Sequence, residues 1–181
     1  PANMSLYPKG GIRHPVAKDH IGRTPSPRPG VRVKSLVRRV ISGGGEAETR
    51  YNKAIGYHAF NLYALALLKQ ALPDHPFWTG GVMRSALGYV ESDEFVPALD
   101  DNEYGYPYNP PGFEIAFALH VFADRYRRDT TNEMIGWVSG QLVRCYDWDR
   151  SQMSLGTEDP ATHSARLYEA TRLPDMVLDL K

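Results

Sequence analysis

The hydrophobic pattern of the chain predicts a body of helices after Gly45. Apolar residues run almost without interruption over 54–68 and again over 115–123. A helix that is apolar on every face is a buried one, so we predict inner helices at 49–72 and from Pro110 to about Arg128. Segments that are more polar but keep helical spacing predict outer helices, at 77–92, 132–146 and 160–171.

Prolines and capping residues mark the starts of these predicted helices. Pro76, Pro111 and Pro160 stand where a proline opens a helix, and Asp129-Thr130-Thr131 can cap the helix that begins near Asn132. Inner and outer helices that alternate along a chain are typical of helices packed in layers. We therefore expect a mainly α fold of antiparallel helical hairpins in two layers.

The first 45 residues have a different character. Prolines and glycines interrupt residues 1–30, where they disfavour regular hydrogen bonding. The run VRVKSLVRRVI at 31–41 alternates at first and predicts a short strand, and Ser42-Gly43-Gly44-Gly45 then breaks the chain. We thus expect an irregular or short-β arm at 1–45 and a helical domain at 46–181.

Charge is unevenly spread along a chain whose formal net charge is zero. Residues 1–44 carry nine basic side chains and one acidic side chain, Asp19, so the remainder is acidic. Such a basic arm can contact a polyanion, or it can fold back onto its own acidic body. Because the two parts cancel so closely, we favour the second interpretation and do not expect nucleic acid as a partner.

Composition narrows the class of protein further. A chain of 181 residues with 42% hydrophobic residues can bury the core of one domain. A single cysteine, Cys145, excludes an internal disulfide and a cysteine-rich metal site. We see no signal peptide and no apolar run of the ~20 residues that span a bilayer, which predicts a soluble protein of undetermined compartment. No pattern predicts a metal or a cofactor.

The loop before Pro110 is the richest in chemistry. Tyr104, Tyr106 and Tyr108 alternate there with polar residues that include Asp101 and Asn109. Aromatic rings beside hydrogen-bonding groups suit a sugar, whose faces are apolar and whose rim carries hydroxyls. We predict that these five side chains bind substrate. The alternative is a structural loop whose tyrosines pack on the helix ends.

Glu114 is the sharpest catalytic candidate. It lies in the first turn of a predicted helix that is otherwise apolar. Burial would raise the pKa of its carboxyl group, whereas the helix N-terminus would lower it, and a carboxyl group tuned in this way can act as a general acid or base. The alternative is that Glu114 only satisfies free N–H groups of that first turn.

His58 and Asn61 form a second candidate pair on the first inner helix, next to Tyr57. Residues three apart share a helix face, so the pair predicts a polar stripe that either hydrogen-bonds within the core or lines a cavity. The near-neutral pKa of histidine suits proton transfer. We predict a catalytic role for His58 and substrate binding by Asn61 and Tyr57.

Other acidic residues, His163 and Cys145 give weaker indications of chemistry. Asp100 or Asp101 could pair with Glu114 as the second carboxylate of a hydrolase. Glu158-Asp159 with His163 resembles an acid/base or metal cluster, but an aspartate before a proline is well explained as a helix cap. Cys145 has no base partner in the sequence, so we do not expect it to be a nucleophile.

Two short motifs carry a resemblance to a known class of proteins. The helix containing Tyr57-His58-Ala59-Phe60-Asn61-Leu62 and the loop end Pro110-Pro111-Gly112-Phe113-Glu114 resemble the (α/α) toroids of the N-acylglucosamine 2-epimerase and six-hairpin glycosidase type. The resemblance implies a sugar held at one end of the inner helices, with proton transfer by His58, Tyr108 and Glu114. A complete toroid has more helices than this chain predicts. The resemblance therefore implies the C-terminal portion of one, or a fold completed by a second chain or a homo-oligomer.

These observations lead to two hypotheses about function. The first is a carbohydrate-active enzyme, or the C-terminal part of one, that acts on a sugar or uronate by general acid/base chemistry, as an epimerase, a lyase or a hydrolase. The second is a non-catalytic helical subunit or scaffold that docks a partner chain or polyanion through its basic arm.

Overall fold

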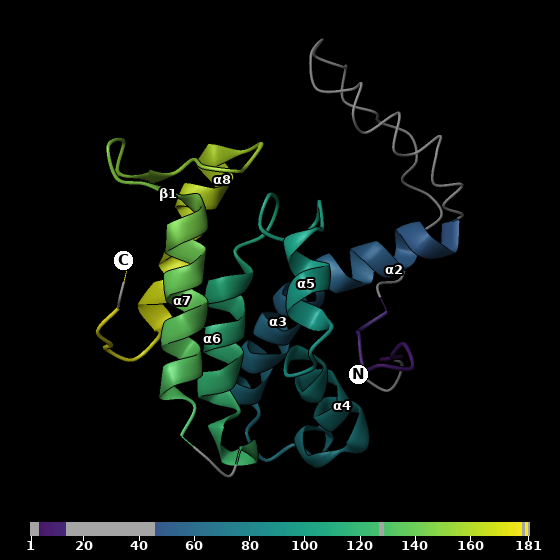
Figure 1. The fold of residues 1–181 in the computed structure, drawn as a ribbon. Helices are drawn as coiled ribbons and strands as arrows, with labels where there is room; N and C mark the ends of the chain where they lie inside the picture. Colours follow the sequence, from purple (N-terminus) through teal and green to yellow (C-terminus); the bar gives the residue numbers. More distant parts are fainter. Residues whose placement is uncertain (1–3, 14–45, 127–128, 179, 181) are drawn as a thin grey trace.

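The computed structural model describes residues 4–13, 46–126, 129–178 and 180, and these form a mainly helical fold (Figure 1). Helix α6 (Pro111–Val121) packs between α3 (His58–Ala71) and α7 (Thr131–Cys145). All of its residues from Pro111 to Leu119 are buried. The prediction of a helix without a polar face at this place is confirmed, because α6 has neighbours on both sides.

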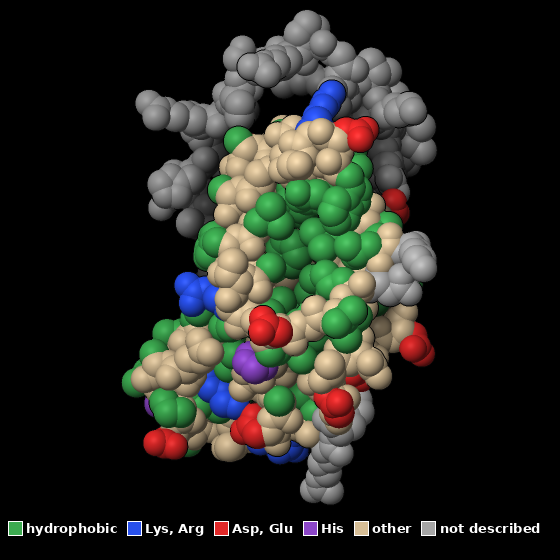
Figure 2. All heavy atoms as spheres, turned by 90° about the vertical axis from the view of Figure 1, so that its left-hand side faces the viewer, with side chains coloured by type: hydrophobic (Ala, Val, Ile, Leu, Met, Phe, Trp, Pro, Cys, Tyr) green, Lys and Arg blue, Asp and Glu red, His purple; other side chains and the backbone are tan. Residues whose placement is uncertain are grey.

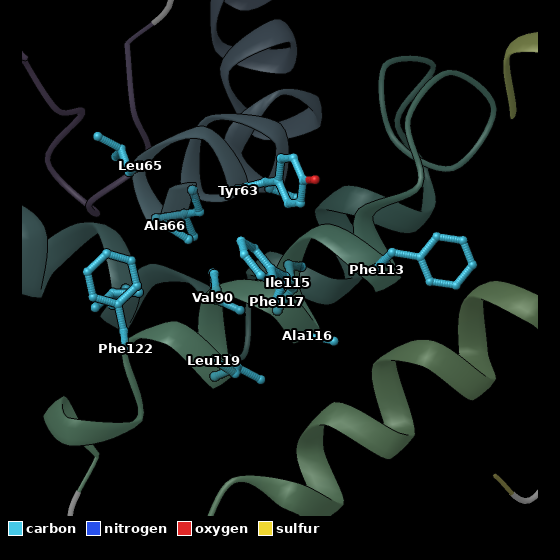
Figure 3. Close-up of a cluster of buried hydrophobic side chains, with 14 of the residues drawn as sticks. Tyr63, Leu65, Ala66, Val90, Phe113, Ile115, Ala116, Phe117, Leu119 and Phe122 are labelled. Atoms are coloured by element: carbon cyan, nitrogen blue, oxygen red, sulfur yellow. The ribbon is translucent and has the colours of Figure 1, made fainter. Parts of the chain in front are cut away.

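The core lies mainly between α3 and α6. Tyr63 and Ala66 of α3 lie with Ile115 and Phe117 of α6 in one cluster of buried side chains (Figure 3). The opposite side of α3 is different, because Phe60, Ala64 and Leu68 are exposed on it. Of the two predicted inner helices, α6 is therefore buried all round and α3 is buried on one side.

The helix predicted at 49–72 is in fact two helices. A single residue, Tyr57, separates helix α2 (Glu46–Gly56) from α3. A Cβ at Gly56 would lie 2.3 Å from the Cβ of Tyr104, so the loop before α6 packs directly against the backbone at this junction. The side-chain amide of Asn109 in the same loop donates to the Gly56 carbonyl (3.3 Å). This bond takes up a helix-end carbonyl that would otherwise lack a partner.

The remaining elements refine the predicted boundaries. The predicted loop at 93–109 contains a short helix, and the predicted helix at 160–171 continues as a 3₁₀ helix after its first turns. A two-stranded hairpin, which the pattern did not predict, pairs Tyr146 with Met153. The described elements not yet named are η1 (Pro76–Thr79), α4 (Gly81–Val90), α5 (Phe95–Asp100), η2 (Ala123–Arg125), β1 (Tyr146–Asp147), β2 (Gln152–Met153), α8 (Pro160–Ala165) and η3 (Arg166–Arg172).

The described part of the N-terminal arm packs on the helical domain. Ile12 is buried in the main core, and Lys9 forms an ion pair with Glu94. Gly10 has a φ of +100°, and a Cβ there would lie 2.3 Å from the Ser85 carbonyl oxygen. The strand expected at 31–41 lies outside the described residues, and the division of the chain at residue 45 stays a prediction.

Helices α6 and α7 approach each other closely at Gly112. A Cβ at this position would lie 2.4 Å from the Trp137 carbonyl oxygen. The Gln141 side chain accepts a hydrogen bond from the Gly112 N–H (3.0 Å) and donates to the sulfur of Cys145 (3.2 Å). Burial raises the pKa of the Cys145 thiol to about 11, so this thiol is a neutral part of the α6–α7 contact.

The N-terminal end of α6, the loop before it, the hairpin and α8 lie toward the top of Figure 1. Figure 2 shows hydrophobic side chains gathered on the side of the molecule where α7 and the C-terminal segment lie. No helix in the described ranges is both long enough and apolar enough to cross a membrane.

Candidate functional site

Glu114 lies in the first turn of α6 and is fully buried. One carboxylate oxygen accepts a hydrogen bond from the Arg166 guanidinium. Burial raises the pKa of Glu114 from its ordinary 4.5 to about 8, and the positive charge of Arg166 opposes this rise. Since burial has the larger effect, Glu114 carries a proton over much of the neutral pH range.

Arg166 is the centre of the site. It lies at the start of η3, and its side chain is 15% exposed. Besides Glu114, it donates from Nε to Glu169 (2.8 Å) and from Nη1 to the amide oxygen of Asn109 (3.1 Å). Its guanidinium also lies 5.4 Å from the centre of the Phe60 ring. One cation therefore joins α3, α6, η3 and the loop before α6.

Two buried oxygens in this cluster remain without a hydrogen-bond partner among the described residues. They are Oε2 of Glu114 and Oε2 of Glu169. Burial also raises the pKa of Glu169, while Arg166 and Arg172 lower it. Two buried carboxyl groups that share one guanidinium favour a state in which one of them is protonated, and the pKa of about 8 points to Glu114 as that group.

An aromatic cluster lies beside these charged groups. The Tyr57 ring lies 6.3 Å from Phe60, 6.0 Å from Tyr104 and 5.8 Å from Tyr108. Tyr108 is 57% exposed and Phe60 is 41% exposed, so the cluster reaches the surface. Burial, helped by Tyr108, raises the pKa of the Tyr57 hydroxyl. These rings offer a surface on which the apolar face of a sugar can stack.

His58 lies elsewhere in the structure. Its Nδ1 accepts a hydrogen bond from the Ile12 N–H (3.2 Å), and its Nε2 donates to the Ala86 carbonyl (2.9 Å). The ring is fully buried against Tyr89 and Phe95, and burial lowers its pKa to about 4. Because main-chain groups occupy both nitrogens, the structure supports a packing role for His58 instead of the predicted proton transfer with Glu114.

The other candidates from the sequence are distributed as follows. Tyr106 is buried, and its ring lies 4.7 Å from the Arg144 guanidinium, which also pairs with Asp100 (3.3 Å). Asp101 is exposed at the end of α5, and Asn61 is half-buried on α3. The structure thus brings Tyr57, Tyr104, Tyr108, Asn109 and Glu114 together, whereas Tyr106 and Asp100 belong to a separate contact with α7.

Sequence reasoning missed the partners of Glu114. Arg166 and Glu169 follow His163 at intervals of three residues. In a 3₁₀ helix, residues three apart lie on one face, so a repeat of three in this polar segment was the available signal. His163 is also buried, next to the backbone of Tyr108. Burial lowers its pKa.

The donor set at this site does not suit a metal ion. Within residues 4–13, 46–126 and 129–178, no three His, Cys, Asp or Glu side chains are grouped so that they could hold one. At Glu114 and Glu169, the place next to both carboxylates is taken by a guanidinium. A carboxyl group with a cation beside it is an arrangement that can transfer a proton.

Comparison with known proteins gives one informative relative. The chain is 37% identical, over 191 aligned positions, to the archaeal glycosylation protein Q of Haloferax volcanii. The alignment covers 97% of this chain but 47% of that protein, so the chain spans about half the length of the curated relative. No family model matches the chain, and no solved structure matches it significantly.

Proposed function

We propose that this chain is part of a carbohydrate-active enzyme that serves protein glycosylation, with Glu114 as its proton-transfer group. The observation that carries the proposal is the buried carboxyl group of Glu114, held by Arg166 beside a partly exposed aromatic cluster, and burial raises its pKa. The name of the Haloferax volcanii relative supports the connection with glycosylation.

The charges at the site fit general acid/base catalysis. A carboxyl group with a pKa of about 8 can give up a proton near neutral pH. Once it is ionised, Arg166 stabilises the carboxylate, which can then take a proton back. In an epimerase or lyase, the same guanidinium could stabilise enolate-like charge on the substrate. In a hydrolase, Glu169 would be the second carboxylate, in place of Asp100 or Asp101.

The aromatic cluster supports a sugar as the substrate. Tyr57, Phe60 and Tyr108 present rings at the surface next to Arg166, and sugar-binding sites commonly combine apolar ring contacts with a few fixed polar groups. A hexose or a uronate of an oligosaccharide would place its ring on the cluster and its reacting carbon toward Glu114.

The exposed face of α3 supports the further proposal that this chain is part of a larger helical toroid. Phe60, Ala64, Leu68 and Leu72 are exposed along it, with Leu68 at 49%. An apolar helix face is normally covered by another helix, and the curated relative is about twice as long as this chain. Because Phe60 touches Arg166, a helix packed on this face would also close one side of the candidate site.

Glycan analysis in cells tests the proposed function. A strain that lacks the protein is complemented with the wild-type gene, with Glu114→Gln, or with the control Glu103→Gln, which changes an exposed glutamate in the loop before α6. We expect Glu114→Gln to give the altered protein-linked glycans of the deletion strain, and Glu103→Gln to give the wild-type glycans, by mass spectrometry. Wild-type glycans with Glu114→Gln would contradict the proposal and favour the scaffold hypothesis.

A further inference from the structure

Asn109 stands between the loop before α6 and the Arg166 guanidinium. Its side-chain oxygen accepts a hydrogen bond from Nη1 of Arg166 (3.1 Å), and its amide nitrogen donates to the carbonyls of Gly56 (3.3 Å) and Tyr104 (2.7 Å). The residue is 2% exposed. Since both amide hydrogens are in use and the side chain is buried, Asn109 is poorly placed for the direct contact with a sugar that its position in the sequence predicts.

The contacts of Asn109 determine how the guanidinium is held. The guanidinium group is flat and presents its donors in a fixed fork. Glu169 holds Nε and Asn109 holds Nη1, which leaves Nη2 facing Glu114. A planar group that is fixed at two of its nitrogens has little freedom to turn. We propose that Asn109 is a positioning residue that orients Arg166 toward the carboxyl group of Glu114.

This inference rests on the proposed function, in which Glu114 transfers the proton. The titratable groups that act on Glu114 are Arg166 and Glu169. His163 lies one turn before Arg166, Arg172 acts on Glu169, and Glu169 acts on Tyr63. Among the described charged residues, Arg166 is the one that bonds to Asn109, so a change at Asn109 reaches Glu114 through Arg166.

The chain offers a matched control in Asn102. This asparagine is also buried and also anchors the loop, because it donates to the Asn52 carbonyl (2.8 Å) and accepts from the Tyr104 N–H (2.8 Å). These two partners lie on α2 and in the loop, and neither of them is Arg166. If the role of Asn109 were purely structural, Asn102→Ala and Asn109→Ala would change the titration of Glu114 to the same extent.

The experiment measures the titration of Glu114 itself. Carbon NMR of protein labelled at the glutamate carboxyl carbons follows the titration, and the spectrum of Glu114→Gln assigns the signal. Asn109→Ala should raise the midpoint of Glu114 by roughly one pH unit, because weaker pairing with Arg166 favours the neutral carboxyl group. Asn102→Ala should leave this midpoint within about 0.2 pH unit of the wild-type value.

Equal shifts in the two variants, or no shift in Asn109→Ala, would overturn the positioning role. If Asn109→Ala does not fold, Asn109→Ser takes its place, since serine keeps a donor for the loop but is too short to reach Arg166. The titration needs no substrate. Wild-type glycans with Glu114→Gln would therefore contradict the proposed function alone. An unchanged Glu114 midpoint in Asn109→Ala would contradict the positioning role alone.

Discussion

Arg166 donates a hydrogen bond to Glu114 from a position 52 residues further along the chain. This contact joins the start of η3 to the first turn of α6 and places a guanidinium group next to a fully buried carboxyl group. Breaking a buried pair by removing one partner is far more costly than breaking an exposed one. The stability of the protein and the chemistry of the candidate site therefore depend on the same contact.

Replacing Arg166 should destabilise the fold. Arg166→Met leaves Glu114 and Glu169 buried without their shared cation, and we expect a loss of about 3 kcal/mol in the free energy of unfolding. Arg144→Met is the control, because Arg144 also pairs with a carboxylate, Asp100, but both side chains are 42% exposed. That variant should lose less than about 1 kcal/mol. Urea unfolding measures both, and similar losses would contradict the central place of Arg166.

Glu114 should make the protein less stable as the pH rises from neutral to about 8. Its pKa is raised from 4.5 to about 8, so between these values the folded chain keeps a proton that the unfolded chain releases. Stability then falls with rising pH by at most about 1.4 kcal/mol per pH unit, and this fall ends above pH 8. Glu169 acts in the same direction.

His58 has the opposite effect in a lower pH range. Burial lowers its pKa from 6.5 to about 4, so the unfolded chain binds the extra proton and stability is lost as the pH falls below 6.5. Unfolding in urea between pH 6.5 and 8.5 therefore avoids the range in which His58 acts, and the Glu114→Gln variant separates Glu114 from the Cys145 thiol, which acts in the same direction as Glu114 near pH 8.5. The fall should be smaller in Glu114→Gln than in the wild type, and parallel curves would show that Glu114 is ionised throughout.

His58 should matter for stability and not for proton transfer. His58→Leu keeps the approximate volume but leaves the Ile12 N–H without its acceptor, which should cost about 2 kcal/mol in the free energy of unfolding. The protein-linked glycans of a strain carrying this variant should match the wild type once protein levels are equalised. Altered glycans at wild-type stability would restore His58 to the candidate site.

The exposed face of α3 gives a prediction about the larger assembly. In the isolated chain, Leu68→Glu should change the free energy of unfolding by less than about 0.5 kcal/mol, since Leu68 is already 49% exposed. In the longest natural form of the protein, the same substitution should cost about 2 kcal/mol if helices cover this face. Val143→Glu on α7 is the exposed control. Equal, small effects in both forms would argue against packing on α3.

Much of the helical core could be predicted from the sequence, because an uninterrupted run of apolar residues indicates a helix that is buried on all sides. The confirmed example is α6, whose uniform pattern matches its place between two other helices. The break at Tyr57 could not be predicted. Apolar residues continue through it, and its cause is the close approach of Tyr104 to Gly56, a contact across nearly fifty residues.

The part of the candidate site whose residues lie close together in the sequence could be predicted. Tyr57, Tyr108 and Glu114 lie near helix starts and the loop between them, so their association follows from the predicted elements. Arg166 was not predictable, since its partners come from three other segments of the chain. The pairing of His58 with Glu114 was expected from two helix starts at one end of the molecule, but the His58 ring bonds to Ile12 and Ala86 instead.

The burial of Cys145 has a practical consequence. It is the single cysteine of the chain, the residue is 1% exposed, and its sulfur accepts a hydrogen bond from Gln141, the residue through which α7 contacts Gly112. A thiol reagent can reach it only when α6 and α7 separate, so the rate of labelling reports how often they do so. The native sequence thus contains its own probe of local opening, next to the helix that carries Glu114.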